Sequence, residues 1–174
     1  MNFTPFPELQ TDMLLLRQLQ PTDWKEIIVL RSDKVINQYV KRPQAKNKVE
    51  ALAFIKRITT ATKNNESLYW CITLKDNPKM IGSISLWNFS KDLKTAEVGY
   101  DLMPEFQGNG FMNEAMKIVL YFGFNELQFQ KIEAYTHRDN EPSKQLLLKN
   151  DFKHIEDRVD QENPDNIIFE LDCR

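Results

Sequence analysis

The sequence predicts a single α/β (α+β) domain, with a mixed, mostly antiparallel sheet of about seven strands and helices on both faces. Three observations predict this fold class. The chain has 174 residues, 41% of them apolar, which is typical of one globular domain. Its apolar residues recur with the period of a strand or of a helix in the order β-α-α-β-β-β-α-β-α-β-β. No linker, repeat or low-complexity stretch divides residues 1–174.

The first elements are a strand and two helices. A run of apolar residues predicts a strand over 13–19 that ends before Pro21, and the Thr-Asp pair that follows supplies cap candidates for a helix over 22–30. Apolar residues then recur every three or four positions over 48–62, which predicts a second, amphipathic helix.

A meander of three strands comes next. Strands over 68–74 and 80–87 flank the turn formers of D-N-P-K, so we expect an antiparallel hairpin. A third strand over 95–102 stops before Pro104.

The C-terminal half alternates helices and strands. The strongest amphipathic helix runs over 112–127 and is followed by a strand over 131–136. A further helix begins at Asn140, because asparagine is a favoured cap and proline falls in the first turn. The last two strands, over 152–159 and 166–172, are expected to form a hairpin.

Composition argues against several classes of protein. The chain has 23 Lys and Arg against 25 Asp and Glu, a net charge of -2, and therefore no basic footprint for direct nucleic-acid binding. Its two cysteines and two histidines have neither metal-ligand nor disulfide spacing, so we expect no metal and a reducing compartment. We find no leader-like segment and no apolar run that could span a membrane, and we expect a cytoplasmic protein.

The glycines point to one loop. Average usage predicts about twelve glycines in this length, but the chain has five, and three of them are Gly99, Gly108 and Gly110. The loop Q-G-N-G-F-M, residues 107–112, leads from a strand into the strongest helix. Unpaired amides and the helix dipole would make an anion site there. A tight structural turn is the alternative.

Several motifs resemble one known family. The segments A-E-V-G-Y-D-L, P-E-F-Q-G-N-G-F-M-N-E-A, and N-E-P-S followed by L-L-L-K-N-D-F-K resemble the acyl-CoA-binding half of the GNAT superfamily of N-acetyltransferases. The segment T-D-M-L-L-L-R-Q-L near the N-terminus is similar to the opening of its Rim-type branch, whose members acetylate the N-termini of ribosomal proteins. The resemblance covers nearly the whole chain and implies acetyl-CoA as cosubstrate.

The resemblance also implies how coenzyme A is held. The superfamily loop [RQ]-x-x-G-x-[GA] falls on Gln107, Gly110 and Met112. Six main-chain amides of the loop would hold the pyrophosphate, those of Gln107, Gly108, Asn109, Gly110, Phe111 and Met112. The preceding strand would splay from its neighbour near Gly99, so that main-chain groups of Tyr100 and Leu102 pair with the pantetheine arm.

The chemistry of amine acetylation needs a base, an oxyanion donor and a group that meets the departing thiolate. Glu97 is the one carboxylate in an otherwise apolar strand segment, where burial would raise its pKa toward that of a base, acting directly or through water. The family motif N-x-x-S falls on Asn140, which would bond the pantetheine, and on Ser143, which would hydrogen-bond or protonate the thiolate. The Leu102 N–H is the candidate oxyanion donor.

Each assignment has a structural alternative. Glu97 could be an exposed carboxylate at a strand end, Asn140 only a helix cap, Ser143 an ordinary first-turn serine and Tyr100 a packed aromatic. His137 follows a strand and is interpreted as a solvated loop residue.

Three positions depart from the family pattern. Asn109 stands where relatives often carry Lys or Arg, and Lys144 or Lys149 is the hypothetical compensating cation. Met112 replaces a small residue. Asp151 stands where the branch usually has glycine before Phe, so this turn uses a residue less tolerant of positive φ.

The acceptor amine is the least determined part. An α-amine with a pKa of ~7.8 is easier to deprotonate than a lysine amine at ~10.4 by ~3.5 kcal/mol, so a single base suits a protein or peptide N-terminus. A groove with Glu97 and Asp101, shaped by the two N-terminal helices and the loops 88–94 and 159–166, would also attract polyamines or aminoglycosides. We expect acetyl transfer from acetyl-CoA to an N-terminal α-amine in a ternary complex. Acetylation of a small amine and a non-catalytic acyl-CoA-binding module are the alternatives, and a homodimer rests on analogy alone.

Overall fold

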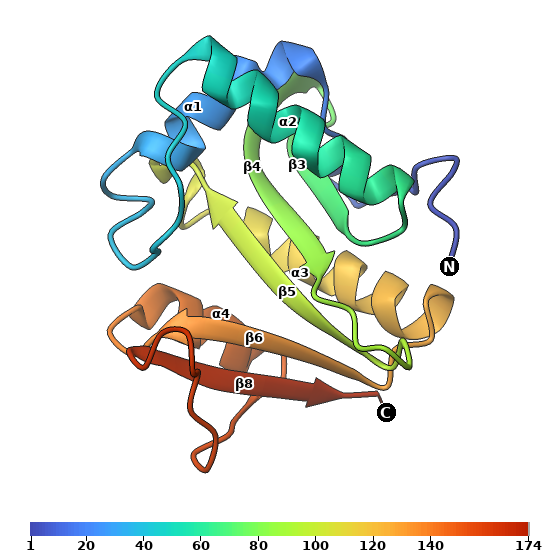
Figure 1. Ribbon diagram of the computed structural model, residues 1–174, viewed down its shortest axis with the longest axis vertical. Helices are drawn as coiled ribbons and strands as arrows, with labels where there is room; N and C mark the ends of the chain where they lie inside the picture. Colours follow the sequence, from blue (N-terminus) through green and yellow to red (C-terminus); the bar gives the residue numbers. More distant parts are fainter. Residues whose placement is uncertain (174) are drawn as a thin grey trace.

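The computed structural model describes residues 1–173 and contains an eight-stranded sheet in the order β1-β2-β3-β4-β5-β6-β8-β7 (Figure 1). The strands are β1 Leu9–Gln10, β2 Leu14–Gln18, β3 Leu68–Leu74, β4 Asn77–Trp87, β5 Thr95–Leu102, β6 Lys131–His137, β7 Lys153–His154 and β8 Asn166–Asp172. The helices are α1 Trp24–Ser32, α2 Lys48–Lys63, α3 Phe111–Tyr121 and α4 Glu141–Lys149. Neighbouring strands are antiparallel, except that β5 and β6 are parallel. The predicted fold class is confirmed. Within the described residues, no helix is long and apolar enough to cross a membrane.

The strands agree with the prediction where apolar and polar residues alternate over a long segment. The predicted strands 68–74, 95–102 and 166–172 match β3, β5 and β8 at both ends. The predicted antiparallel pairing of 152–159 with the last strand is confirmed only for the two residues of β7, and the predicted length is wrong because the chain turns away after them. The two-residue strand β1 was not predicted, since so short a segment carries no readable period.

The four helices lie where predicted but begin or end differently. The pattern over 112–127 corresponds to α3, which stops at Tyr121, and a π-helical turn after it. The helix predicted over 22–30 opens as a 3-10 turn, so α1 begins at Trp24. At the start of α4 the predicted cap is confirmed, because Asn140 Oδ1 accepts a hydrogen bond from the Ser143 amide at 3.2 Å.

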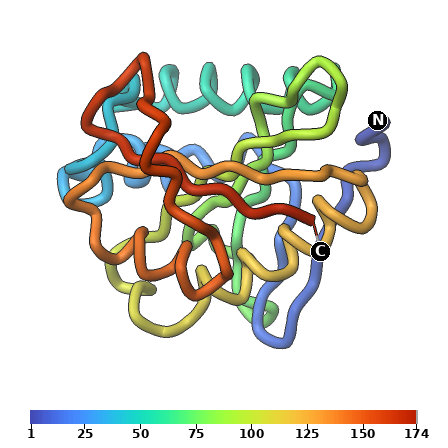
Figure 2. The backbone as a smooth tube through the Cα atoms, turned by 90° about the horizontal axis from the view of Figure 1, so that it is seen from below, coloured from blue at the N-terminus to red at the C-terminus, as the bar shows by residue number. Residues whose placement is uncertain are grey.

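Helices cover both faces of the sheet (Figures 1 and 2). We call these the α1/α2 face and the α3/α4 face. Apolar side chains of α1 and α2 pack with Cys71 of β3 in one core, and those of α3 and α4 pack with β2 to β6 and β8 in a larger one. Along β5, Ala96, Val98 and Leu102 belong to the core of the α3/α4 face. Because side chains alternate along a strand, Glu97 and the other odd-numbered positions of β5 face the α1/α2 side.

β5 and β6 diverge after a short parallel pairing, which ends at Glu97 and Glu133 (Figure 1). On its other edge β5 stays paired with β4 as far as Leu102. The Met103 amide donates to Ile81 O at 2.9 Å, one position beyond the last pair of the register, Gly82 with Leu102. Hydrogen-bonded and non-bonded pairs alternate in an antiparallel ladder. The main-chain groups of Leu102 and, two residues earlier, Tyr100 therefore point away from β4, toward the divergence.

Candidate active site

The loop at 107–112 presents a row of amides at the start of α3. Gly108 and Gly110 have φ of 77° and 81°, in the left-handed region that favours glycine, and a Cβ on either would meet open space. The first hydrogen bond of α3 runs from the Glu114 amide to Gly110 O at 3.0 Å. Within the described chain, the amides of residues 108–113 have no protein acceptor. They make the kind of site that binds an anion at a helix N-terminus.

Two side chains hold this loop in shape. Gln107 Nε2 donates to Leu102 O at 2.9 Å, and Asn109 Nδ2 donates to Gln107 O at 3.1 Å. The Gln107 amide itself donates to Pro104 O at 3.1 Å, so the expectation that it is a free donor is corrected. The free donors run from Gly108 through Met112 and include one more, Asn113, which the motif did not indicate.

The departures from the family pattern have structural outcomes. Asp151 has a φ of 65°, so this turn does use a left-handed aspartate. Lys144 is ion-paired with Glu141, which engages one of the two candidate cations. Lys149 lies at the end of α4, next to Asn150, whose Nδ2 donates to Asn113 Oδ1 in the first turn of α3 at 3.0 Å. The end of α4 therefore lies beside the amide row.

Tyr100 and Ser143 form a hydroxyl pair on the α3/α4 face. The Tyr100 phenol oxygen lies 2.8 Å from Ser143 Oγ, and Ser143 is 9% exposed. Burial raises the pKa of Tyr100 to about 12, against the opposing effect of the Ser143 hydrogen bond, so the phenol is protonated at neutral pH. The sequence alone indicates Tyr100 only as a packed aromatic or a source of main-chain contacts. Its position two residues from Val98 and Leu102 was the signal that its ring shares their face.

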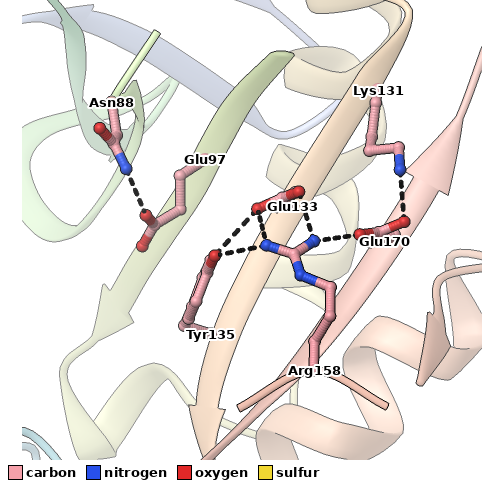
Figure 3. A network of polar contacts seen from close by, with 7 residues as sticks. All are labelled: Asn88, Glu97, Lys131, Glu133, Tyr135, Arg158 and Glu170. Carbon is pink, nitrogen blue, oxygen red and sulfur yellow. Dashed lines mark hydrogen bonds and ion pairs between the residues drawn. The ribbon is translucent and has the colours of Figure 1, made fainter. Parts of the chain in front are cut away.

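Glu97 lies on the opposite face, with Asn88 as its partner. Asn88 Nδ2 donates to Glu97 Oε2 at 3.4 Å (Figure 3). The pKa of Glu97 is raised to about 7, first by burial and then by the negative charges of Glu133, Asp160 and Glu162, while the hydrogen bond from Asn88 opposes the rise. Partial burial and a raised pKa distinguish Glu97 from the ordinary exposed carboxylate that was the alternative.

Asp101 is not the free carboxylate that the predicted cation-attracting groove requires. Its Oδ2 lies 2.9 Å from Nη1 of Arg42, and its Oδ1 accepts from Ser83 Oγ at 2.5 Å. Arg42 also donates to Leu30 O, the carbonyl of a residue in α1, at 2.8 Å. The pair therefore fastens the segment between α1 and α2 onto β5, and its net charge is zero.

His137 and Cys71 are the other residues considered as a base or a nucleophile, and both are engaged in or buried by the surrounding structure. His137 Nδ1 accepts from the Asp139 amide at 3.1 Å, and its ring lies 5.3 Å from that of Tyr39, between centroids. Cys71 is fully buried, and burial raises the pKa of its thiol, which stays protonated. Cys71 lies in β3, which β4 and β5 separate from β6, whereas His137 is the last residue of β6, on the part of the strand that diverges from β5.

Comparison with known proteins gives one consistent result. The sequence matches the acetyltransferase (GNAT) domain family over residues 13–153. The uncharacterised N-acetyltransferase YoaA of Bacillus subtilis is 31% identical over 148 residues, which cover 85% of this chain and 84% of that protein.

Solved structures share the fold. The ribosomal L7/L12 α-N-protein acetyltransferase RimL, solved in complex with coenzyme A, has a TM-score of 0.82 at 16% identity and covers 95% of this chain and 98% of its own. The ribosomal-protein-S5-alanine acetyltransferase of Vibrio fischeri has a TM-score of 0.78 at 18% identity, with 95% and 96% covered. At such identities the likeness concerns the fold alone.

Proposed function

Because this chain belongs to the GNAT family and is an acetyl-CoA-dependent N-acetyltransferase, we propose that its acceptor is the α-amine at the N-terminus of a protein or peptide. The expected alternative of a non-catalytic coenzyme-binding module is dropped with the family assignment. The observation that carries the proposal is Glu97, a partly buried carboxylate whose pKa is raised to about 7 and that has no cation beside it within the described residues. Such a base is matched to an α-amine, whose pKa is ~7.8, and poorly matched to a lysine amine at ~10.4.

The proposed donor site lies on the amide row and the divergence. The amides of Gly108 to Asn113 hold the diphosphate, and the outward main-chain groups of Tyr100 and Leu102 bind the pantetheine as an added strand would. Asn140 uses its Oδ1 as the cap of α4, which leaves its Nδ2 for the pantetheine. These residues fit coenzyme A because the amides of 108–113 have no protein acceptor within the described residues and the outward edge of β5 is free of a strand partner, although Leu102 O already accepts from Gln107 Nε2.

In the proposed reaction the amine attacks the thioester carbonyl while Glu97 takes its proton. A C–N bond forms, the C–S bond breaks, and the Leu102 N–H stabilises the oxyanion between the two events. Ser143, itself bonded to the Tyr100 phenol, donates a hydrogen bond to the departing sulfur. A phenol with a pKa of about 12 does not protonate a thiolate whose acid has a pKa near ~8.5, so the hydroxyl pair stabilises the thiolate by hydrogen bonding.

A second acceptor class is favoured by the charges near Glu97. Asp160 and Glu162 raise its pKa, and neither is in an ion pair with any described residue. A small polyamine would therefore find uncompensated negative charge beside the base.

An acceptor panel tests the proposal. Release of free thiol from acetyl-CoA is measured with a peptide that has a free N-terminus, with the same peptide blocked at its N-terminus but carrying lysine, and with spermidine. We expect kcat/KM for the free N-terminus to exceed that for the blocked peptide at least 100-fold. Preference for spermidine or for the blocked peptide would refute the α-amine assignment while leaving the enzyme class intact.

A further inference from the structure

Three glutamates form a row across neighbouring strands on the face that carries Glu97. Glu97 of β5 is in register with Glu133 of β6, which is in register with Glu170 of β8 (Figure 3). Neighbouring strands lie roughly 4.8 Å apart, so three like charges would stand side by side, which is unfavourable without cations.

Two cations, Arg158 and Lys131, pair with glutamates of this row, and neither pairs with Glu97. Nη1 of Arg158 lies 2.7 Å from Glu133 Oε1, and Nη2 lies 3.2 Å from Glu133 Oε2. The same guanidinium donates to Glu170, whose other oxygen lies 2.5 Å from Nζ of Lys131. Glu97 receives only the amide of Asn88, at 3.4 Å, among the described residues. The carboxylate without a cation is therefore the one next to the divergence of β5 and β6.

Glu133 is held in its ionised form. The Tyr135 hydroxyl donates to Glu133 Oε2 at 3.0 Å and accepts from Nη2 of Arg158 at 3.1 Å. Burial raises the pKa of Glu133, but the hydrogen bonds from Arg158 and Tyr135 and the positive charges of Arg158 and Lys131 together lower it more, so the net shift is downward. Two carboxylates on adjacent strands are thus shifted in opposite directions, which separates the group that titrates from the one that does not.

The other charged groups around Glu97 are accounted for. Asp160 and Glu162, from the segment before β8, act on it at longer range, and Asp101 of its own strand is paired with Arg42. Glu133 is the charged neighbour in direct register with Glu97, so the net charge at Glu133 affects the pKa of Glu97 more than that at any other of these groups.

We propose that Arg158 is a positioning residue for acetyl transfer, which binds Glu133 and Glu170 and so leaves Glu97 as the single carboxylate of the row able to take the proton of the amine. The proposal rests on the proposed function, in which Glu97 is the base. Arg158 acts through Glu133.

The test is a titration that needs no acceptor. The side-chain carboxyl carbon of Glu97 is followed by ¹³C NMR in the whole protein and identified by its loss in Glu97→Gln. In Arg158→Gln, the uncompensated charge of Glu133 should move the titration midpoint of Glu97 upward by about one pH unit. Glu133→Gln should move it downward, and the double variant should return it to near the wild-type value. The acid limb of kcat/KM should follow the same three shifts, with coenzyme affinity unchanged.

The outcomes separate the two claims. If the folded Arg158→Gln protein keeps the wild-type midpoint, or if it shifts in the same direction as Glu133→Gln, the inference is overturned. If Glu97→Gln keeps the wild-type acid limb, the base assignment fails instead. Should Arg158→Gln not fold, Arg158→Lys, which keeps the charge but not the paired hydrogen bonds, should give a smaller upward shift. Its midpoint staying in place would equally overturn the proposal.

Discussion

Replacing Gly110 by valine tests whether the main chain at the start of α3 holds the coenzyme. Gly110 has a φ of 81°, and a Cβ there meets nothing within 4 Å, so the cost of a side chain is conformational and not steric crowding. For an ordinary L-residue that cost is about 1–2 kcal/mol, and more for a β-branched one. If the chain relaxes to negative φ, the amides of Phe111 and Met112 turn away. Two hydrogen bonds to a charged group are worth about 3–6 kcal/mol together, which corresponds to roughly 100-fold to 10,000-fold in affinity.

Calorimetric titration with coenzyme A measures this loss of affinity. A shorter acetyl donor shows whether the loss arises at the diphosphate. S-acetylpantetheine lacks the diphosphate, so Gly110→Val should lower kcat/KM for acetyl-CoA and leave kcat/KM for S-acetylpantetheine nearly unchanged. Gly110→Asn is the matched control, because asparagine tolerates the left-handed region, and it should retain most of the affinity. Equal losses with both donors, or full coenzyme affinity in Gly110→Val, would refute the placement of the diphosphate.

Three further predictions concern other parts of the site. Glu97→Gln should lower kcat by about 100-fold or more without changing coenzyme affinity. Because the folded pKa of Glu97, about 7, lies above its unfolded value, the free energy of unfolding of the wild-type protein should fall by at most about 3 kcal/mol as pH rises from 4.5 through 7. Urea unfolding at pH 5 and pH 8 should show that the variant lacks this fall. Tyr100→Phe and Ser143→Ala should each lower kcat by roughly 10-fold, and the double variant by little more than the worse single one, since they share one hydrogen bond. Fully additive effects would show that the two hydroxyls do not act as a pair. Gly82→Ala places a Cβ 2.5 Å from Asp101 O, a main-chain atom of β5. The substitution should lower the free energy of unfolding in chemical denaturation by about 1–3 kcal/mol and raise the KM for acetyl-CoA. An unchanged unfolding midpoint would show that β5 can move freely.

The sequence was most informative where one period dominates. β5 could be predicted to the residue because Ala96, Val98 and Leu102 alternate with polar or small residues and Pro104 follows. The end of the chain before β8 was misread, because 152–159 contains apolar residues without alternation. What turns the chain there is partly the ion pairing of Arg158 with glutamates of β6 and β8, which are distant in sequence.

In the candidate site, too, the features with a local sequence signal could be predicted and those that depend on distant residues could not. The loop at 107–112 could be predicted because glycine spacing and the start of a helix are local signals, and the structure gives both glycines a left-handed φ. The asymmetry between Glu97 and Glu133 could not be predicted, since both read as single acidic residues within apolar strands. Only the parallel register of β5 with β6 makes them neighbours, and only a residue more than twenty positions further along neutralises one of them.

A single strand therefore serves both substrates in the proposed reaction. Successive residues of β5 differ in what they offer: Glu97 and Asp101 present side chains to the α1/α2 face, whereas Tyr100 and Leu102 present main-chain groups to the divergence. Gly99 stands between them, and even a Cβ there would come 3.3 Å from Ser85 Oγ and 3.5 Å from Trp87 Nε1. With no side chain at that position, an amine on one face can approach a thioester held in the plane of the sheet. In the proposed reaction the divergence after Glu97 and the glycine two residues later therefore serve the same step, because the first makes room for the thioester and the second for the amine.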